Sequence, residues 1–313
     1  MVIGPNAKVS TFCGGGSSAL APYYAITPYD GIVSKTNCKE VPFTVGAYSH
    51  KELPLLGPSL RTADGQIGVS FSAYLEPPTV GNSRERVDYK IVKKTDMFMF
   101  DYVCPKDTKG IWYADIEGSL TPDMDGDFEL GLCVYGTAKL YVDGNLIIDN
   151  ESKQRQGTVF FGNGTLEEIG EISVKKGQTY HLKVEYASAA TNKLGGGGVI
   201  RFGGGGVRIG GAYKIDPMEE ISRAVELAKK ADQVVVCAGL NVSYVLILLL
   251  HHPLSFDKAK LLYLLRRIGK VKAMIVKTCC SQGISTRLYL ESQRATLTQP
   301  LSSKQEVQWK CRG

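Results

Sequence analysis

The sequence predicts a mainly β protein in which an antiparallel β-sandwich is inserted into a partial α/β sandwich domain. Residues 64–213 alternate apolar and polar side chains with a period of two, divided by turn residues. Residues 214–241 change to a helical period followed by an apolar strand, which resumes the α/β layer begun in residues 1–63. The 35 glycines among 313 residues favour many tight turns, as short strands require.

Several strands of the inserted sandwich can be placed from the alternation. Asp143-Gly144 is a strong two-residue hairpin signal between two apolar runs. Trp112 and Tyr113 are expected in the core, and Val199–Phe202, between two runs of four glycines, is expected to be a hairpin strand. The apolar faces of the two clearest strands are formed by Phe128, Leu130, Leu132 and Val134, and by Tyr180, Leu182, Val184 and Tyr186.

The flanking segments have the pattern of an α/β layer. Met1–Ile3 is interpreted as the end of a buried strand, so further chain is expected upstream, and a short helix is expected to begin at Thr27. Asp216 is a plausible N-cap, with Pro217 and Glu219 in the first turn. Val234–Ala238 is expected to be a buried parallel strand. In the second helix, Met218, Ile221, Val225 and Ala228 are expected to form the apolar stripe, with Glu220, Arg223 and Lys230 facing water.

Charge and cysteine content exclude several classes of protein. The net charge of +6 is concentrated beyond Val242, where the only acids are Asp257, Glu291 and Glu306, so the body is mildly acidic and does not suggest binding to nucleic acid. The longest apolar run, Tyr244–Leu250, is too short to span a bilayer. The eight cysteines form no CxxC pair and are expected to be buried thiols. No signal peptide is visible, which favours the cytoplasm over secretion without deciding it.

A set of short sequence motifs gives the chain a family resemblance. They are Val2-Ile3-Gly4-Pro5-Asn6-Ala7, Gly14-Gly15-Gly16-Ser17, Tyr23-Tyr24 with Thr27-Pro28, His50-Lys51-Glu52-Leu53-Pro54, and Ala231-Asp232 through Ala238-Gly239-Leu240-Asn241. Leu140–Gly144 and Phe160–Thr165 look like the inserted protective-antigen-type (PA14) domain of some members. Over residues 1–241 the chain resembles fungal family 3 glycoside hydrolases.

The resemblance implies a retaining β-glucosidase that acts on β-D-glucosides and cello-oligosaccharides. Such chemistry needs two carboxyl groups about 5–5.5 Å apart. The family's nucleophile, an aspartate in a Ser-Asp-Trp motif, has no counterpart here. The acid/base is a glutamate shortly after Gly-Leu-Asn in the family, but here Gly239-Leu240-Asn241 is followed by no carboxylate until Asp257. We therefore expect a fragment that is inactive by itself, with no catalytic residue of its own. The alternative is a non-catalytic carbohydrate-binding β-sandwich module.

The resemblance to the family ends at Asn241 and does not extend into residues 242–313. Val242-Ser243 can be encoded by GTAAGT, which looks like the start of a fungal intron, so this basic tail is interpreted as mistranslated sequence. A second interpretation stays open. Lys258–Lys272 places Leu261, Leu262, Leu265 and Ile268 at helical spacing, which would suit a basic amphipathic segment with a membrane or protein partner.

Phe160 and Phe161 are the expected substrate-binding residues, because the resemblance implies that this loop leans over the glucosidase pocket and an aromatic ring can stack on a sugar. No cofactor and no metal are expected. Val134 and Tyr135 occupy the positions at which the resemblance implies two calcium-binding aspartates, and Asp123, Asp125 and Asp127 fit a solvated turn better than a calcium loop. The expected partners are β-glucoside sugars, without nucleic acid or membrane, and a homo-oligomer is left open for the full-length relative. The sequons at Asn150, Asn163 and Asn241 matter only in a secreted protein.

Overall fold

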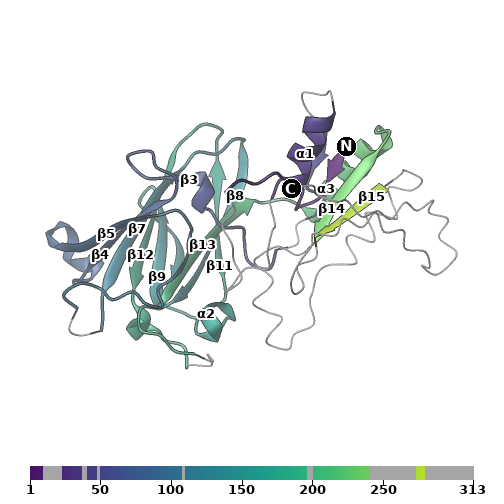
Figure 1. Cartoon of the computed structure of the whole chain (residues 1–313). Coiled ribbons are helices and arrows are strands. Elements are labelled where there is room, and N and C mark those ends of the chain that lie inside the picture. The colour runs from purple at the N-terminus through teal and green to yellow at the C-terminus, as the bar shows by residue number, and fades with distance from the viewer. Residues whose placement is uncertain are drawn as a thin grey trace. The chain divides into compact units, whose positions relative to one another are not determined.

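The structure is a computed structural model that describes residues 1–9, 23–36, 41–47, 50–107, 110–195, 200–239 and 273–278. The chain divides into two compact units. One is Glu52–Lys214, and the other combines Met1–Lys51 with Ile215–Gly313. In Figure 1 the first unit consists mainly of strands, whereas the second contains the two longer α-helices. The predicted fold class, a β-sandwich inserted into a partial α/β domain, is confirmed.

A parallel sheet forms the centre of the α/β unit. Its strands follow the order β15-β14-β1-β2, with β1 at Val2–Ile3, β2 at Phe43–Thr44, β14 at Val234–Gly239 and β15 at Ala273–Thr278. Val2 pairs in parallel with Val235 on one side and with Phe43 on the other. Val2 and Ile3 are fully buried, as an inner parallel strand requires. The expected strand at 234–238 is therefore confirmed.

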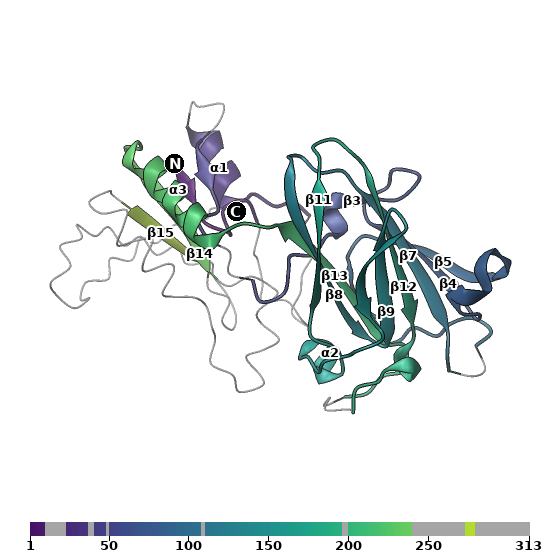
Figure 2. The same ribbon diagram turned by 180° about the vertical axis from the view of Figure 1, so that it is seen from behind.

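One helix packs against each face of this sheet. Successive residues of a strand point to opposite faces, so Val2 lies on one face, where α1 (Pro28–Lys35) packs with Tyr29, Ile32 and Val33. Ile3 lies on the other face, against α3 (Pro217–Lys229). Figure 2 shows both helices beside β14 from behind.

Both helices begin with an N-cap, and the cap at Asp216 is the one that the sequence suggested. Thr27 and Asp30 form a reciprocal capping box at α1, and Asp216 accepts hydrogen bonds from the backbone N–H groups of Met218 (2.7 Å) and Glu219 (3.1 Å) at α3. The expected stripe of α3 needs two corrections. Met218 is 52% exposed because it lies in the first turn, outside the apolar cluster that begins at Ile221. Glu220 is half-buried because it accepts a hydrogen bond from Thr44 of β2.

The inserted unit is built from two antiparallel sheets. The larger follows the order β10-β9-β12-β7-β4-β5, with β3 also paired to β7, and the smaller follows β11-β8-β13-β6. The strands of the larger sheet are β3 (Leu60–Arg61), β4 (Val69–Tyr74), β5 (Arg86–Val92), β7 (Tyr113–Leu120), β9 (Thr137–Val142), β10 (Asn145–Asn150) and β12 (Tyr180–Ala187). Those of the smaller sheet are β6 (Asp96–Phe98), β8 (Gly126–Tyr135), β11 (Glu168–Val174) and β13 (Gly206–Tyr213).

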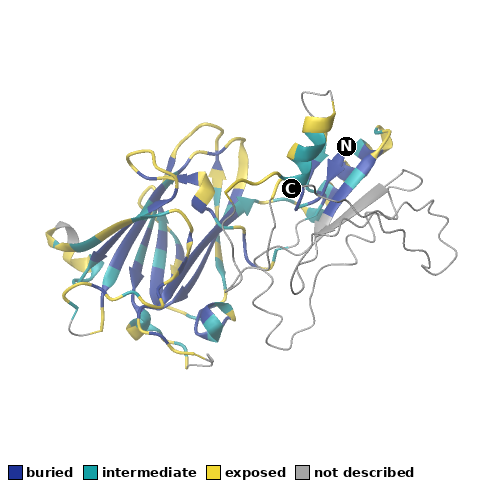
Figure 3. Cartoon of the chain, in the orientation of Figure 1, coloured by how far each residue is buried: buried dark blue, intermediate teal, exposed yellow. Residues whose placement is uncertain are grey.

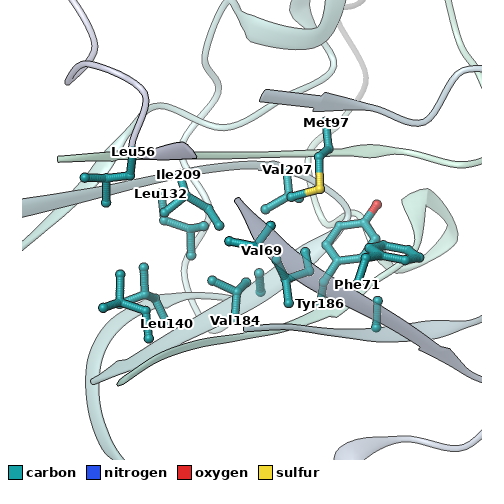
Figure 4. Packing of buried hydrophobic residues seen from close by; sticks show 14 of the residues in the cluster. Leu56, Val69, Phe71, Met97, Leu132, Leu140, Val184, Tyr186, Val207 and Ile209 are labelled. Carbon is teal, nitrogen blue, oxygen red and sulfur yellow. The ribbon is translucent and has the colours of Figure 1, made fainter. Parts of the chain in front are cut away.

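The core lies between these two sheets. Figure 4 shows Leu132 of β8 and Val207 of β13 facing Leu140 of β9 and Val184 of β12. Buried residues alternate with more exposed ones along β9 and β12, and the strands of the sandwich carry much of the dark blue in Figure 3. The faces expected for 128–134 and 180–186 are confirmed, and Trp112 is buried, although Tyr113 is only half-buried.

The Asp143-Gly144 hairpin is confirmed, but the strand expected at Val199–Phe202 is wrong. Asp143 and Gly144 have φ angles of 48° and 80° and join β9 to β10, as a type I′ turn requires. Residues 200–202 are irregular, and Val199 lies outside the described residues. Phe202 packs on other aromatic rings instead of entering a ladder, and glycine at 204 lets the backbone approach Met99 closely.

Three further expectations concern the rest of the chain. Cys104, Cys133 and Cys237 are buried free thiols, as expected, and the other cysteines lie outside the described residues. Of residues 240–313 only β15 is described, so the possible helix at Lys258–Lys272 is not. No helix in the described part of the chain has the length and apolar character needed to cross a membrane.

Candidate functional site

The Phe160-Phe161 segment forms a left-handed turn at one end of the sandwich (Figure 1). In α2 (Val159–Gly162), the φ angles of Phe160, Phe161 and Gly162 are 53°, 57° and 80°. Left-handed backbone costs an L-residue roughly 1–2 kcal/mol, which glycine avoids. Two consecutive phenylalanines in this conformation are strained, so surrounding contacts must hold the turn in place.

Those contacts come from an aromatic cluster that joins four parts of the unit. The rings of Phe98 and Phe160 are 4.9 Å apart, those of Phe98 and Phe161 5.4 Å, and those of Phe100 and Phe202 5.0 Å between centroids. Such distances are typical of favourable aromatic pairs. The cluster comprises Phe98 and Phe100 at the end of β6, Phe160 and Phe161 in α2, Phe202 before β13, and Tyr135 at the end of β8.

The two expected substrate-binding residues occupy different environments. Phe160 is 1% exposed, and a β-carbon at Gly206 would lie 2.5 Å from its ring, so Phe160 anchors the turn and presents no free face. Phe161 is half-buried. Phe98 and Phe100, which are 40% and 46% exposed, add to it. The rings that reach the surface are therefore those of Phe161, Phe98 and Phe100.

Phe98 and Phe100 were missed at the sequence level. Methionine and phenylalanine alternate along Met97–Phe100. Because both residue types are apolar, the pattern does not tell which of the two faces the core. In the structure Met97 and Met99 are buried and the two phenylalanines point the other way. An apolar residue on both faces of one short strand was the available signal for an exposed aromatic surface.

A buried ion pair lies on the outer face of the smaller sheet. Glu167 Oε1 is 3.0 Å from Arg208 Nη1, and each side chain is 7% exposed. Both residues also hold the backbone of Leu53: its N–H donates to Glu167 Oε2 at 2.8 Å, and Arg208 Nη2 donates to its carbonyl at 2.6 Å. Gly131 and Gly210 leave the space that Glu167 and Leu53 fill. We call this arrangement the Glu167–Arg208 clamp.

Burial controls the protonation of the clamp. It raises the pKa of Glu167 to about 7, although the Leu53 N–H and Arg208 both act to lower that pKa. Burial likewise raises the pKa of Asp96, which Arg208 opposes. Loss of hydration therefore outweighs one guanidinium shared between carboxylates. Nothing in the sequence pattern singled out this pair, because it depends on Leu53 covering an outward-facing strand position.

Residues 74–204 match one known protein family, described as the PA14 domain. These residues form a PA14 domain. The match lies within the compact unit Glu52–Lys214 and includes the left-handed turn. The sequence-based recognition of an inserted PA14-type sandwich is thereby confirmed.

The PA14 domain and its flanking segments are similar to parts of fungal β-glucosidases. The chain is 49% identical over 241 residues to probable beta-glucosidase I of Aspergillus clavatus, covering 77% of this chain and 28% of that protein. It is 48% identical, with the same coverage, to probable beta-glucosidase J of Emericella nidulans. The structure of Kluyveromyces marxianus beta-glucosidase in complex with glucose matches with a TM-score of 0.74 and 35% identity, over 90% of this chain and 33% of that one. The resemblance to fungal family 3 β-glucosidases is confirmed.

The chain spans less than a third of the length of the curated relatives it matches. The similarity therefore shows which part of such proteins this chain corresponds to. It does not by itself give the chain the activity of a whole relative.

The acidic loop of the PA14 domain binds its own neighbours. Asp123 accepts a hydrogen bond from the Tyr213 hydroxyl (2.9 Å), Asp125 from the Lys176 N–H (2.7 Å) and Asp127 from the Ser173 hydroxyl (2.8 Å). The three carboxylates thus have separate partners. Within the described ranges, no three His, Cys, Asp or Glu side chains gather in a way that could hold a metal ion.

Proposed function

We propose that this chain is a segment of a retaining β-glucosidase whose PA14 domain contacts the sugar through the ring of Phe161. The observation that carries the proposal is the strained turn of α2, which holds Phe161 at the surface beside Phe98 and Phe100. Strained backbone persists only where the surrounding structure holds it, and it concentrates at functional sites. Exposed aromatic rings supply the flat apolar surface on which the C–H face of a pyranose can stack.

Similarity supports a β-glucoside as the sugar. The Kluyveromyces marxianus β-glucosidase structure contains glucose, and its chain matches this one across 90% of the residues here. The proposed substrates are β-D-glucosides and cello-oligosaccharides. Phe161 takes the role of contact residue, and Phe160 supports it from below.

The carboxylates needed for glycoside hydrolysis have no counterparts in this chain, so it should be inactive by itself. Purified residues 1–313 are expected to release no nitrophenol from an aryl β-glucoside above a heat-inactivated control. A β-glucosidase with both carboxylates, assayed in the same buffer, controls for the assay. Turnover that follows this protein through two purification steps would contradict the proposal.

The tail itself supports an origin in a β-glucosidase gene. DNA that encodes Ile268–Gly283 can also be read in a second frame, which begins at the last base of the Arg267 codon. With suitable codons this second frame spells Asp-Trp-Glu-Ser-Glu-Gly-Tyr-Asp-Arg-Gln-Asp-Met-Leu-Leu-Pro-Gly. With AGG at Arg267, the bases before this frame are AG, as at the end of an intron. The second frame places Trp-Glu after Gly239-Leu240-Asn241, where the resemblance implies the acid/base. β15 lies in this segment, so a spliced product would have different residues there.

The transcript around Asn241 separates this proposal from the alternative of a non-catalytic sugar-binding module. We expect messenger RNA in which the bases from the Val242 codon through the second base of the Arg267 codon are removed and the second frame follows. Sequencing of complementary DNA, with genomic DNA as the control, makes the measurement. Transcripts that retain the whole interval, with no spliced form, would favour the non-catalytic module.

A further inference from the structure

The sequon Asn163-Gly164-Thr165 directly follows the left-handed turn, and its asparagine points inward. Asn163 is 3% exposed. Its side-chain Nδ2 donates to the carbonyl of Phe160 at 3.0 Å and to the carbonyl of Ile200 at 2.5 Å. An amide nitrogen has two hydrogens, so both are used.

Thr165 of the same sequon and Asn150 of the other sequon in the PA14 domain are buried as well. Thr165 is fully buried, and its hydroxyl oxygen accepts hydrogen bonds from the Val134 N–H (3.1 Å) and from Asn150 Nδ2 (2.9 Å). Asn150, the first residue of the other sequon, also donates to the Leu132 carbonyl at 2.8 Å. A glycan on either asparagine would displace these bonds. In the folded domain the two sequons are therefore structural polar networks.

The two carbonyls that Asn163 binds belong to different parts of the aromatic cluster. Phe160 lies in α2, whereas Ile200 lies two residues before Phe202, whose ring is 6.4 Å from that of Phe161. Glycines surround both segments, so the backbone supplies little rigidity of its own. One buried amide thus ties the strained turn to the segment that packs against it.

We propose that Asn163 is the positioning residue of the aromatic turn. By donating to both carbonyls it holds α2 against residues 200–202 and fixes the direction of the Phe161 ring. The inference rests on the proposed function only where it links this geometry to sugar contact. Aspartate at this position has almost the same shape but only accepts hydrogen bonds when ionised. It would remove both side-chain donors and place a charge against the two carbonyls. The Phe160 carbonyl keeps the Asn163 backbone N–H at 3.1 Å, whereas the Ile200 carbonyl loses the donor that ties residues 200–202 to α2.

The test uses the full chain labelled with 4-fluorophenylalanine, with the Phe161 resonance assigned from Phe161→Leu. In Asn163→Asp we expect this resonance to move toward that of free fluorophenylalanine, and the dissociation constant for cellobiose to rise about tenfold or more, equivalent to about 1.4 kcal/mol. Asn192→Asp is the matched control. Its Nδ2 donates to the carbonyl of Asn163 at 3.3 Å, so it perturbs the same residue without touching the two donors.

The outcomes distinguish this inference from the proposed function. A wild-type chain that shows no response to cellobiose, with a displaced Phe161 resonance in Asn163→Asp, removes the sugar contact and supports the positioning role. An unmoved resonance in Asn163→Asp overturns the positioning role, whatever the sugar does.

A measurement on the wild-type chain covers the case in which Asn163→Asp does not fold. The Nδ2 hydrogens of Asn163 should exchange with solvent at least about tenfold more slowly than those of Asn145, an exposed residue of the Asp143-Gly144 hairpin. The Asn163 amide is buried, whereas Asn145 Nδ2 is exposed and makes one long bond of 3.4 Å to the Asp143 carbonyl. Equal exchange rates would overturn the proposal.

Discussion

Replacing Arg208 with leucine is expected to lower the free energy of unfolding of the PA14 domain by about 3–5 kcal/mol at pH 8, because it leaves a buried carboxylate without its counter-ion. Glu167 and Arg208 are both 7% exposed, and water cannot replace the lost guanidinium. The variant also removes the donor to the Leu53 carbonyl. Urea denaturation followed by Trp112 fluorescence, in a Trp309→Phe background, measures the effect, since Trp112 is buried in the sandwich core.

The loss should depend on pH in a definite direction. The pKa of Glu167 in the folded chain, about 7, lies above its ordinary value of 4.5. The folded state therefore binds more protons than the unfolded state between these values, and Glu167 favours folding more as the pH falls through 7. Because Arg208 lowers the pKa values of Glu167 and Asp96, its removal raises both. Glu167 is then neutral at pH 5.5, and the loss in Arg208→Leu should shrink to roughly half or less of its value at pH 8.

The neighbouring pair Arg155–Glu168 is the matched control. It has the same residue types and a bidentate geometry, with two contacts of 2.9 Å, but Arg155 is exposed. Exposed ion pairs contribute little to stability, so Arg155→Leu should not measurably change the urea midpoint at either pH. An unchanged midpoint in Arg208→Leu at pH 8 would refute a stabilising role for the clamp.

Phe160→Ala should destabilise the domain and Phe161→Gly should leave its stability nearly unchanged, but both should have the same effect on sugar contact. Phe160→Ala removes a ring that is 1% exposed and is expected to destabilise the domain by about 3–5 kcal/mol. Phe161→Gly removes a half-buried ring but places glycine at a φ of 57°, which relieves roughly 1 kcal/mol of backbone strain. The stability of Phe161→Gly should therefore stay within about 1 kcal/mol of the wild type.

NMR titration with cellobiose, on the order of tens of millimolar for a weak site, measures the second property. Both variants should lose the response of the aromatic cluster. Tyr89→Ala is the control, because it removes a ring that is 46% exposed on β5 of the larger sheet. A cellobiose response in Phe161→Gly equal to that of the wild type would show that Phe161 is not the contact.

The sequence predicted the elements whose pattern is local. The alternation in β8 and β12, the Asp143-Gly144 turn and the Asp216 cap each depend on residues within a few positions of one another. The buried face of each strand and the α/β arrangement followed from periods of two and of 3.6 residues, because one face of each element must be buried.

The site could be predicted only in part, because it is assembled from distant segments. The sequence singled out the Phe160-Phe161 loop as an aromatic segment. The left-handed backbone, which buries one ring and turns the other outward, depends on Gly206 and Asn163 around it. Phe98 ends β6 and Phe202 precedes β13, and these two strands are neighbours only in the folded sheet. The burial of Arg208, on the outer face of the smaller sheet, depends on Leu53, which is 155 positions away.

The two ends of the PA14 unit run side by side. Leu55 pairs antiparallel with Gly210, and the Gly211 N–H donates to the Pro54 carbonyl at 2.8 Å. Once the sandwich has folded, the chain leaves it close to where it entered. The two chain segments that lead into the α/β unit, before Leu55 and after Gly210, are then no farther apart than the paired strands of a hairpin. The entropy of closing a loop grows with the logarithm of its length, and a prefolded insertion removes most of that cost. Folding of the sandwich should therefore come first and bring β1 within reach of β14, with the pairing at Leu55 and Gly210 as the step that couples them.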